Sequence, residues 1–145
     1  MRLDNITAAD LAIVSNQDAI RVNQQWAGFA GDMLNHSSPA VLPLNVTASN
    51  YSRVPTNSVW WKPLPNESAA AVLYASRGSA TIEFRLSELQ YRGKPALPAG
   101  ARGCKSVRSL WEKEGKKELG PLSGPTFSAT VPAGDVVFVV LSGCA

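Results

Sequence analysis

The stretch Val59-Trp60-Trp61-Lys62-Pro63-Leu64, followed by the apolar run from Ala69 to Ala75, decides the fold of this chain. The polar link Pro65-Asn66-Glu67-Ser68 between the two runs predicts a β-hairpin. Neighbouring residues of a strand point to opposite faces of the sheet, so only one of Trp60 and Trp61 can fill the core directly. The other indole needs a loop, a neighbouring domain or a ligand to cover it.

Strand signals continue at regular spacing to the end of the chain. Between Ala80 and Leu86, Ile82, Phe84 and Leu86 alternate with polar residues, which predicts a half-buried strand with those three side chains inward. The run from Val136 to Leu141 is apolar throughout and predicts a central strand covered on both faces. The pattern favours an antiparallel β-sandwich of about six to eight strands. Its predicted strands are 49–54 at an edge, 59–64, 69–76, 80–86, 105–111, 127–131 and 136–141.

The intervening segments predict turns and loops. Glycines and prolines mark a loop over residues 87–103, and a charged connection runs from Glu112 to Gly124. The turn Pro132-Ala133-Gly134-Asp135 then joins the last two strands into a closing hairpin from Phe127 to Leu141.

Residues 7–24 have a helical pattern in two pieces. Thr7 and Asp10 have the spacing of a capping box, and Asn16 both ends the first helix and caps the second. Isolated helices of this length are marginal in water, so both need a partner surface.

Composition excludes several classes of protein. The chain has 145 residues, 17% of them charged, and a net charge of +3. The one basic cluster, Lys113 to Lys117, alternates with glutamates and predicts a solvated loop, not a nucleic-acid footprint. No apolar run approaches the roughly 20 residues that a membrane helix needs, and no signal peptide begins the chain.

Asparagine usage points to the secretory pathway, and thus to a secreted, lysosomal or vacuolar protein. Five of the eight asparagines open an Asn-x-Ser/Thr sequon, whereas chance would give roughly one. A secretory protein without its own signal peptide is expected to be the C-terminal part of a longer chain. The possible N-glycosylation sites are Asn5, Asn35, Asn45, Asn50 and Asn66.

The two cysteines, Cys104 and Cys144, would close a loop of about 40 residues if paired. In the chain-entropy model such a bridge contributes roughly 4 kcal/mol. The separation of the sulfurs cannot be read from sequence, so pairing stays open. Their spacing fits no metal site, and the single histidine, His36, lies inside a polar sequon as an expected bystander.

No catalytic motif is found in the chain. There is no phosphate loop, dinucleotide fingerprint or serine elbow, and no cofactor is expected. Most of the eleven acids have structural or solvated roles: Asp18, for example, falls in the first turn of a helix and Glu83 on the outer face of a strand. The residues by themselves favour a non-catalytic β-sandwich module.

Three stretches, in order, resemble glycoside hydrolase family 27, the α-galactosidases (melibiases) and their relatives. Residues 11–24 are similar to the last barrel helix of that family, and residues 59–64 to its Trp-x-Lys-Pro-Leu phrase. Residues 107–111, together with the ending from Phe127, resemble its closing strands. Gln25 and Ser109 depart from the family pattern, which has an aspartate at each of these positions.

The resemblance implies retaining hydrolysis of terminal α-galactosides in a complete enzyme. It implies residues 1–28 as the last helical segment of a (β/α)8 barrel, 29–58 as a linker with an edge strand, and 59–145 as the C-terminal sandwich. The family's two catalytic aspartates belong to barrel strands upstream, so no catalytic residue is assigned here. The expected partner is the missing barrel, packed on the spare tryptophan, and the chain alone is expected to be inactive.

Two other functions stay open. In a free-standing carbohydrate-binding or lectin-like sandwich, Trp60 or Trp61 would be a platform on which a sugar stacks. A purely structural interaction domain would present an apolar patch like that expected of a domain without its barrel.

Overall fold

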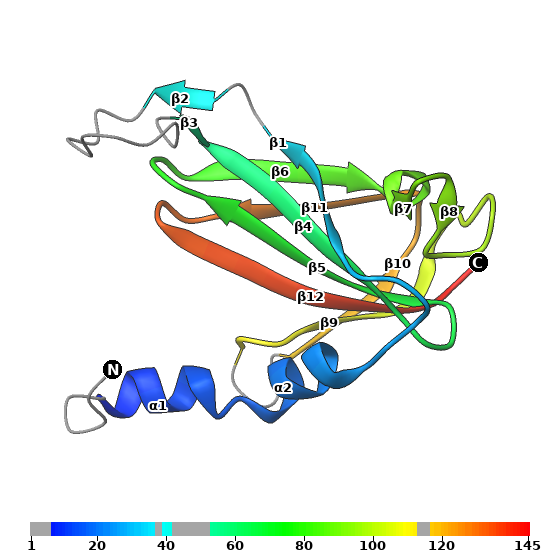
Figure 1. Ribbon diagram of the computed structural model, residues 1–145, viewed down its shortest axis with the longest axis horizontal. Coiled ribbons are helices and arrows are strands. Elements are labelled where there is room, and N and C mark those ends of the chain that lie inside the picture. The colour runs from blue at the N-terminus through cyan, green and yellow to red at the C-terminus, as the bar shows by residue number, and fades with distance from the viewer. Residues whose placement is uncertain (1–6, 37–38, 42–52, 113–116) are drawn as a thin grey trace.

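A computed structural model describes residues 7–36, 39–41, 53–112 and 117–145. A six-stranded antiparallel sheet of order β1-β4-β5-β12-β9-β10 has a two-stranded ribbon, β11-β6, over one face and the two helices on the other (Figure 1). The predicted β-sandwich with one or two leading helices is confirmed. The strands of the sandwich are β1 (Asp32–His36), β4 (Asn57–Leu64), β5 (Ser68–Ala75), β6 (Ala80–Arg85), β9 (Cys104–Ser109), β10 (Glu118–Leu122), β11 (Thr126–Val131) and β12 (Asp135–Cys144).

The predicted hairpin is formed by β4 and β5, which pair from Asn57↔Ala75 to Leu64↔Ser68. At its turn, Asn66 and Glu67 have φ values of 59° and 54°, the left-handed conformation of a tight hairpin turn. Strand β1 pairs with β4 only as far as Trp61, so Pro63 lies beyond the end of that ladder. A proline is tolerated there because its missing N–H breaks no bond to β1.

The two faces of the central sheet have different surroundings. The inner face contributes Val59, Trp61, Leu73 and Val139 to a core that the aromatic residues of the β6–β11 ribbon close. As predicted from the alternation, Trp61 is 4% exposed and its neighbour Trp60 is 51% exposed. The sequence of β4 therefore divides its two indoles between the core and the opposite surface.

The ribbon confirms one alternation pattern and corrects one pairing. Ile82, Phe84 and Leu86 are buried as predicted, and β6 pairs with β11 throughout. The predicted closing hairpin from Phe127 to Leu141 is wrong, because β12 pairs with β5 and β9 and not with β11. The turn at 132–134 instead carries the chain from the ribbon across to the main sheet. Strand β12 is central, as expected, although its outer face is only partly covered.

Two edge strands gave no signal in the sequence. Strand β10 lies within the predicted connection 112–124 and pairs with β9, with irregular register on both sides of Gly120. Strand β1 lies in the segment expected to be a linker, and its residues are mostly polar. Of the predicted edge strand 49–54, residues 49–52 lie outside the described part, and β3 (Arg53–Pro55) pairs there with β2 (Pro39–Val41).

The two leading helices are confirmed as α1 (Ala8–Val14) and α2 (Gln17–Gln24). The Asn16 side chain caps α2 by accepting bonds from the backbone N–H groups of Asp18 and Ala19, at 3.0 and 3.1 Å. The side chain of Asp10 is outside the described residues, so the capping box at Thr7 stays a prediction. The division of the chain after residues 28 and 58 also stays a prediction.

The predicted loop 87–103 contains short regular segments: a 3-10 turn at Leu86–Glu88 and the pair β7 (Gln90–Tyr91) and β8 (Lys94–Pro95). Phe29, in the segment after α2, stacks on Tyr91 with ring centroids 5.7 Å apart and meets Trp61 edge-on at 5.9 Å. These contacts fasten the segment between α2 and β1 to the sandwich. No helix in the described part of the chain has the length and apolar character to cross a membrane.

Candidate functional site

The candidate site is the outer face of the main sheet, on the side of the helices. There the register places Trp60 of β4 opposite Val72 of β5, and Val72 opposite Phe138 of β12. Together with α2, this row lines an open groove of about 310 Å³. Its other lining residues are Ala19, Val22, Asn23, Trp61, Lys62 and Ala70.

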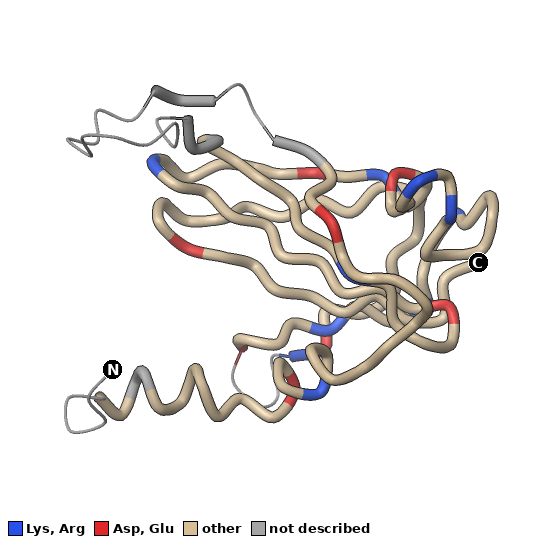
Figure 2. The backbone as a smooth tube through the Cα atoms, viewed as in Figure 1, with Lys and Arg blue, Asp and Glu red and all other residues tan. Residues whose placement is uncertain are grey.

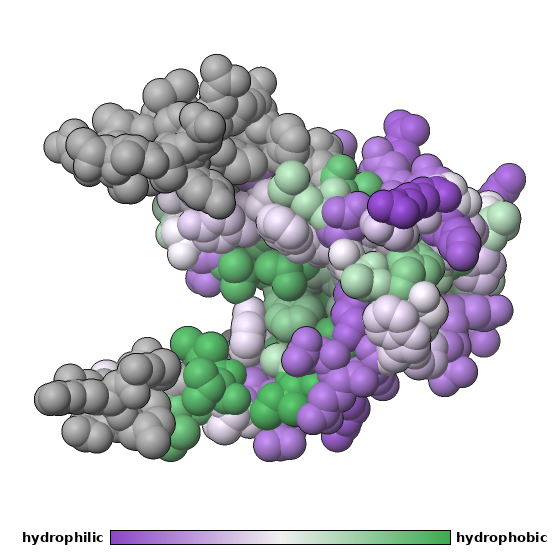
Figure 3. Space-filling view, viewed as in Figure 1, coloured by the Kyte–Doolittle hydropathy of each residue, from purple (hydrophilic) through white to green (hydrophobic). Residues whose placement is uncertain are grey.

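We call the groove, together with the exposed apolar side chains of helix α1, the docking face. Leu11, Ile13 and Val14 of α1 are each more than half exposed, as is Trp60. Figure 3 shows hydrophobic residues along α1 and in the hollow between α1 and the strands. Trp111 packs edge-on against Phe138, with centroids 5.6 Å apart, at the border of this face.

Helix α2 is attached to the sheet at both of its ends. The Asn16 amide donates to the carbonyl oxygen of Leu110 at 2.8 Å. At the other end, the Lys62 ammonium donates to the carbonyl oxygens of Val22 and Asn23, at 2.8 and 2.7 Å. Because carbonyls at a helix C-terminus lack partners within the helix, a lysine placed there stabilises the helix end and holds it on β4.

Charged residues of α2 and of the β9–β10 edge of the sheet lie near one another (Figure 2), and Asp18 and Arg108 form an ion pair between them. The Asp18 carboxylate accepts bonds from Arg108 at 2.8 Å and Lys117 at 3.0 Å. The hydrogen bond from Lys117 lowers the pKa of Asp18 most, and the positive charge of Arg108 adds to this, while burial acts in the opposite direction. Asp18 lies in the first turn of α2, as expected. The expectation of a solvated loop up to Lys117 is wrong at Lys117, whose side chain is only 16% exposed and pairs with Asp18.

The structure brings the two cysteines together. Cys104 of β9 lies directly opposite Cys144 of β12, and the two residues are joined as a disulfide. Cys144 is fully buried at the end of the sandwich core. Since the bridge links adjacent strands, it fixes the end of the last strand to the sheet.

The predicted glycosylation sites fall into two groups. Asn66 is exposed at the tip of the β4–β5 turn. Asn5, Asn45 and Asn50 lie outside the described residues. Asn35 and His36 belong to β1, but their side chains are not among those described, so their predicted roles stay predictions. In the described part of the chain, no three metal-ligating side chains come together.

Sequence reasoning found the two indoles of this site but missed the residues around them. The sequence pattern assigns Lys62 no role of its own, although residues i and i+2 of a strand lie on the same face of the sheet. Lys62 therefore had to lie on the same face as the exposed Trp60. Phe138 could have been placed beside Trp60 only with knowledge of the strand order. The attachment of Asp18 to Lys117 joins residues far apart in the chain and has no local signal.

The family model described as the alpha galactosidase C-terminal beta sandwich domain matches residues 55–141. That range includes β4, β5 and all later strands except the end of β12. No curated protein sequence matches the chain.

Solved structures similar to this chain are much longer glycoside hydrolases. α-Galactosidase from Saccharomyces cerevisiae, solved with raffinose, has a TM-score of 0.70 and 16% identity, over 99% of this chain and 39% of that one. α-Galactosidase I from Mortierella vinacea has a TM-score of 0.65 and 19% identity, over 97% and 30%. A family 27 β-L-arabinopyranosidase from Geobacillus stearothermophilus has a TM-score of 0.64 and 16% identity, over 97% and 25%.

These structures share the fold, and this chain spans less than two fifths of the length of each of the three. At identities of 16–19%, the structural similarity shows only that the fold is shared. The family match covers more than half of the chain. The resemblance noted in the sequence is confirmed for the sandwich. The chain belongs to the family of α-galactosidase C-terminal β-sandwich domains.

Proposed function

We propose that this chain is the C-terminal portion of an α-galactosidase-like glycoside hydrolase that passes through the secretory pathway. Its docking face packs against the catalytic barrel of the same polypeptide. The observation that carries the proposal is the exposed apolar surface of α1 and the groove, which the sandwich itself leaves uncovered.

An uncovered apolar surface of this kind is costly in water. Burying apolar surface contributes about 25 cal/mol per Å², and soluble monomers rarely expose large contiguous apolar patches. Helix α1 has only seven residues, and isolated helices shorter than about 12 residues are marginal in water. An apolar partner over α1 and the groove would stabilise both at once.

In the complete enzyme, the resemblance implies a retaining mechanism. One carboxylate attacks the anomeric carbon of a terminal α-galactoside, while the other protonates the leaving oxygen and then activates water. Both carboxylates are assigned to the barrel and none to this chain. The contribution of the sandwich is to cover and stiffen the barrel.

The first test is turnover of a chromogenic α-galactoside by the purified chain, with a complete family 27 α-galactosidase as the positive control. We expect no turnover above buffer. Turnover that depends on chain concentration and survives repurification would overturn the assignment of chemistry to the barrel.

The second test asks whether the docking face is an apolar contact surface. We expect an environment-sensitive dye such as ANS to fluoresce with the chain, and Ile13→Asp to lower that signal at least twofold. Thr130→Asp, on the exposed face of the ribbon, is the matched control and should leave the signal unchanged. Equal signals from both variants would remove the docking face from the proposal.

A second candidate is carbohydrate binding by the isolated sandwich, since Trp60 presents half of its indole beside a groove. Sugar sites combine an aromatic platform with several hydrogen-bonding groups. Here Asn23 and Lys62 are the polar side chains of the lining, and the Lys62 ammonium is engaged by α2. Saturable quenching of tryptophan fluorescence by galactose, lost in Trp60→Ala, would favour this candidate over barrel packing.

A further inference from the structure

The tight turn between β4 and β5 contains the sequon Asn66-Glu67-Ser68, in which the asparagine is exposed and the serine is buried. Asn66 is exposed at the tip of the turn. Ser68 is 8% exposed, and its hydroxyl donates a hydrogen bond to the Asn66 carbonyl oxygen at 3.0 Å. An enzyme that modifies Asn-x-Ser must bind the hydroxyl as well as the amide, and the folded turn offers only the amide.

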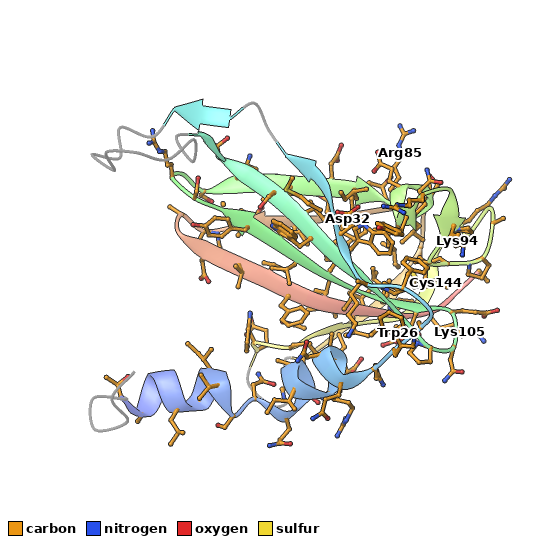
Figure 4. All side chains as sticks on the ribbon, in the orientation of Figure 1. Trp26, Asp32, Arg85, Lys94, Lys105 and Cys144 are labelled. Atoms are coloured by element: carbon orange, nitrogen blue, oxygen red, sulfur yellow. A yellow bond between two sulfur atoms is a disulfide. The ribbon has the colours of Figure 1, made fainter. Side chains whose placement is uncertain are left out.

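The last strand of the fold holds the same turn closed. The backbone N–H of Cys144 donates to the Glu67 carbonyl oxygen at 3.2 Å, and Cys144 is joined to Cys104 (Figure 4). The left-handed conformations of Asn66 and Glu67 are also far from an extended peptide. Once Cys144 is in place, the sequon is therefore fixed in a shape that an extended-peptide site cannot accept.

We propose that Asn66 is a site of N-linked glycosylation, and that its glycan is attached before the β4–β5 turn is closed by Cys144. In the reaction, Asn66 Nδ2 forms a bond to C1 of the first sugar of a lipid-diphosphate-linked oligosaccharide. The bond from C1 to the diphosphate oxygen breaks, the lipid diphosphate leaves, and Nδ2 loses one proton to a base of the transferase.

A glycan at Asn66 is compatible with the folded chain. The amide lies on an exposed turn, so attached sugars extend into solvent without displacing the core. The turn and helix α1 lie at opposite ends of the long axis of the molecule (Figure 1). The glycan would thus leave the exposed side chains of α1 free, and this proposal does not depend on the proposed glycosidase function.

The test compares two forms of the full chain produced in bacteria, and hence unglycosylated. One is oxidised and folded, and the other is reduced and alkylated. Since Cys144 is fully buried, an alkyl group on its sulfur has no space in the fold and keeps the chain open. Each is incubated with a purified single-subunit oligosaccharyltransferase and a lipid-linked oligosaccharide. Occupancy is read by mass spectrometry of the tryptic peptide 54–77, in which Asn66 opens the only sequon.

We expect occupancy at least tenfold higher in the open form, and none in an open Ser68→Ala variant, whereas open Ser68→Thr keeps the sequon and is modified. Equal occupancy of the folded and open forms would overturn the proposed order of events. Absence of transfer to the open wild-type chain would overturn the site itself. Neither outcome depends on glycosidase activity, so a failure here is distinct from a failure of the proposed function.

Discussion

Replacing Asp18 with asparagine should remove the charged attachment of helix α2 to the sheet. The Asp18 carboxylate lies 2.8 Å from Arg108, 3.0 Å from Lys117 and 3.6 Å from Arg21. The side chains of Asp18 and Lys117 are only 13% and 16% exposed. An asparagine side chain has nearly the same shape as aspartate but no charge, so the variant isolates the electrostatic part of the contact.

The magnitude follows from the burial of the three partners. A hydrogen bond to a charged group contributes about 1.5–3 kcal/mol, and an exposed ion pair less than about 1 kcal/mol. The side chains of Asp18 and Lys117 are mostly shielded from solvent, so their contact is closer to the first case. Arg108 is 35% exposed and also lies 3.6 Å from Glu118, so its contribution is smaller. We therefore expect a loss of about 2 kcal/mol in the free energy of unfolding. For a chain of 145 residues, that loss lowers Tm by about 6–7 °C.

The pH dependence has a definite sign. In the folded chain the pKa of Asp18 is below its ordinary value of 3.8, mainly because of the Lys117 hydrogen bond. A carboxyl group with a lowered pKa contributes stability that is fully present well above pH 3.8 and is lost as the pH falls through the folded value. The difference between wild type and Asp18→Asn should thus be largest at neutral pH and shrink below about pH 4.

The assay is urea unfolding followed by circular dichroism at about pH 7, where the contribution of Asp18 is fully present, and at about pH 3, below the ordinary pKa of 3.8. Glu83→Gln, an equal change of charge on the exposed face of β6, is the control and should cost less than about 0.5 kcal/mol. A double-mutant cycle with Lys117→Met should give a coupling energy of about 1 kcal/mol or more. The electrostatic attachment of α2 is refuted if Asp18→Asn has the same free energy of unfolding as the Glu83→Gln control at neutral pH. It is also refuted if the loss in free energy relative to wild type is as large at about pH 3 as at about pH 7.

Three further perturbations test other contacts, each by the same unfolding assay. Reducing the bridge between Cys104 and Cys144, which are 40 residues apart, should cost roughly 4 kcal/mol, and a reductant-insensitive midpoint would contradict the bridge. Lys62→Met should cost about 1–2 kcal/mol and speed hydrogen exchange in α2, because two carbonyls at the helix end lose their donor. Gly31→Ala should cost about 1–3 kcal/mol, since an added Cβ would overlap a backbone oxygen of β4, whereas Gly78→Ala meets open space and should cost less than about 1 kcal/mol.

Local patterns accounted for the hairpin and the alternating strands. Whether Trp60 or Trp61 was buried could not be read from β4 alone, but the period of two required that only one be buried. The same period placed Ile82 and Phe84 inward. The break between the helices was also local, because the Asn16 side chain can cap only the helix that follows it.

Strand partners and edge strands could not be read in this way. A short turn after a strand permits either a hairpin or a crossing to the other sheet, and the chain at 132–134 crosses. Strand β10 contains Gly120 and Pro121, which usually mark loops, and as an edge strand it needs no apolar face. The ladder to β9 that stabilises it is formed by residues distant enough to be invisible to a local pattern.

The polar attachments of α2 and the apolar docking face depend on each other. Val22 is the one buried apolar side chain that α2 contributes to the sheet, so the helix is positioned mainly by Asn16, Lys62 and Asp18. Helix α1 continues from α2 across the break at Asn16, so the position of α2 sets where the exposed side chains of α1 stand relative to the groove. A weakened Asp18 contact should therefore change the shape of the docking face before it unfolds the sandwich. The core on the inner face of the sheet does not depend on the bonds made by Asn16, Lys62 and Asp18. A partner of fixed shape would then bind the variant more weakly than the loss of folding stability alone accounts for.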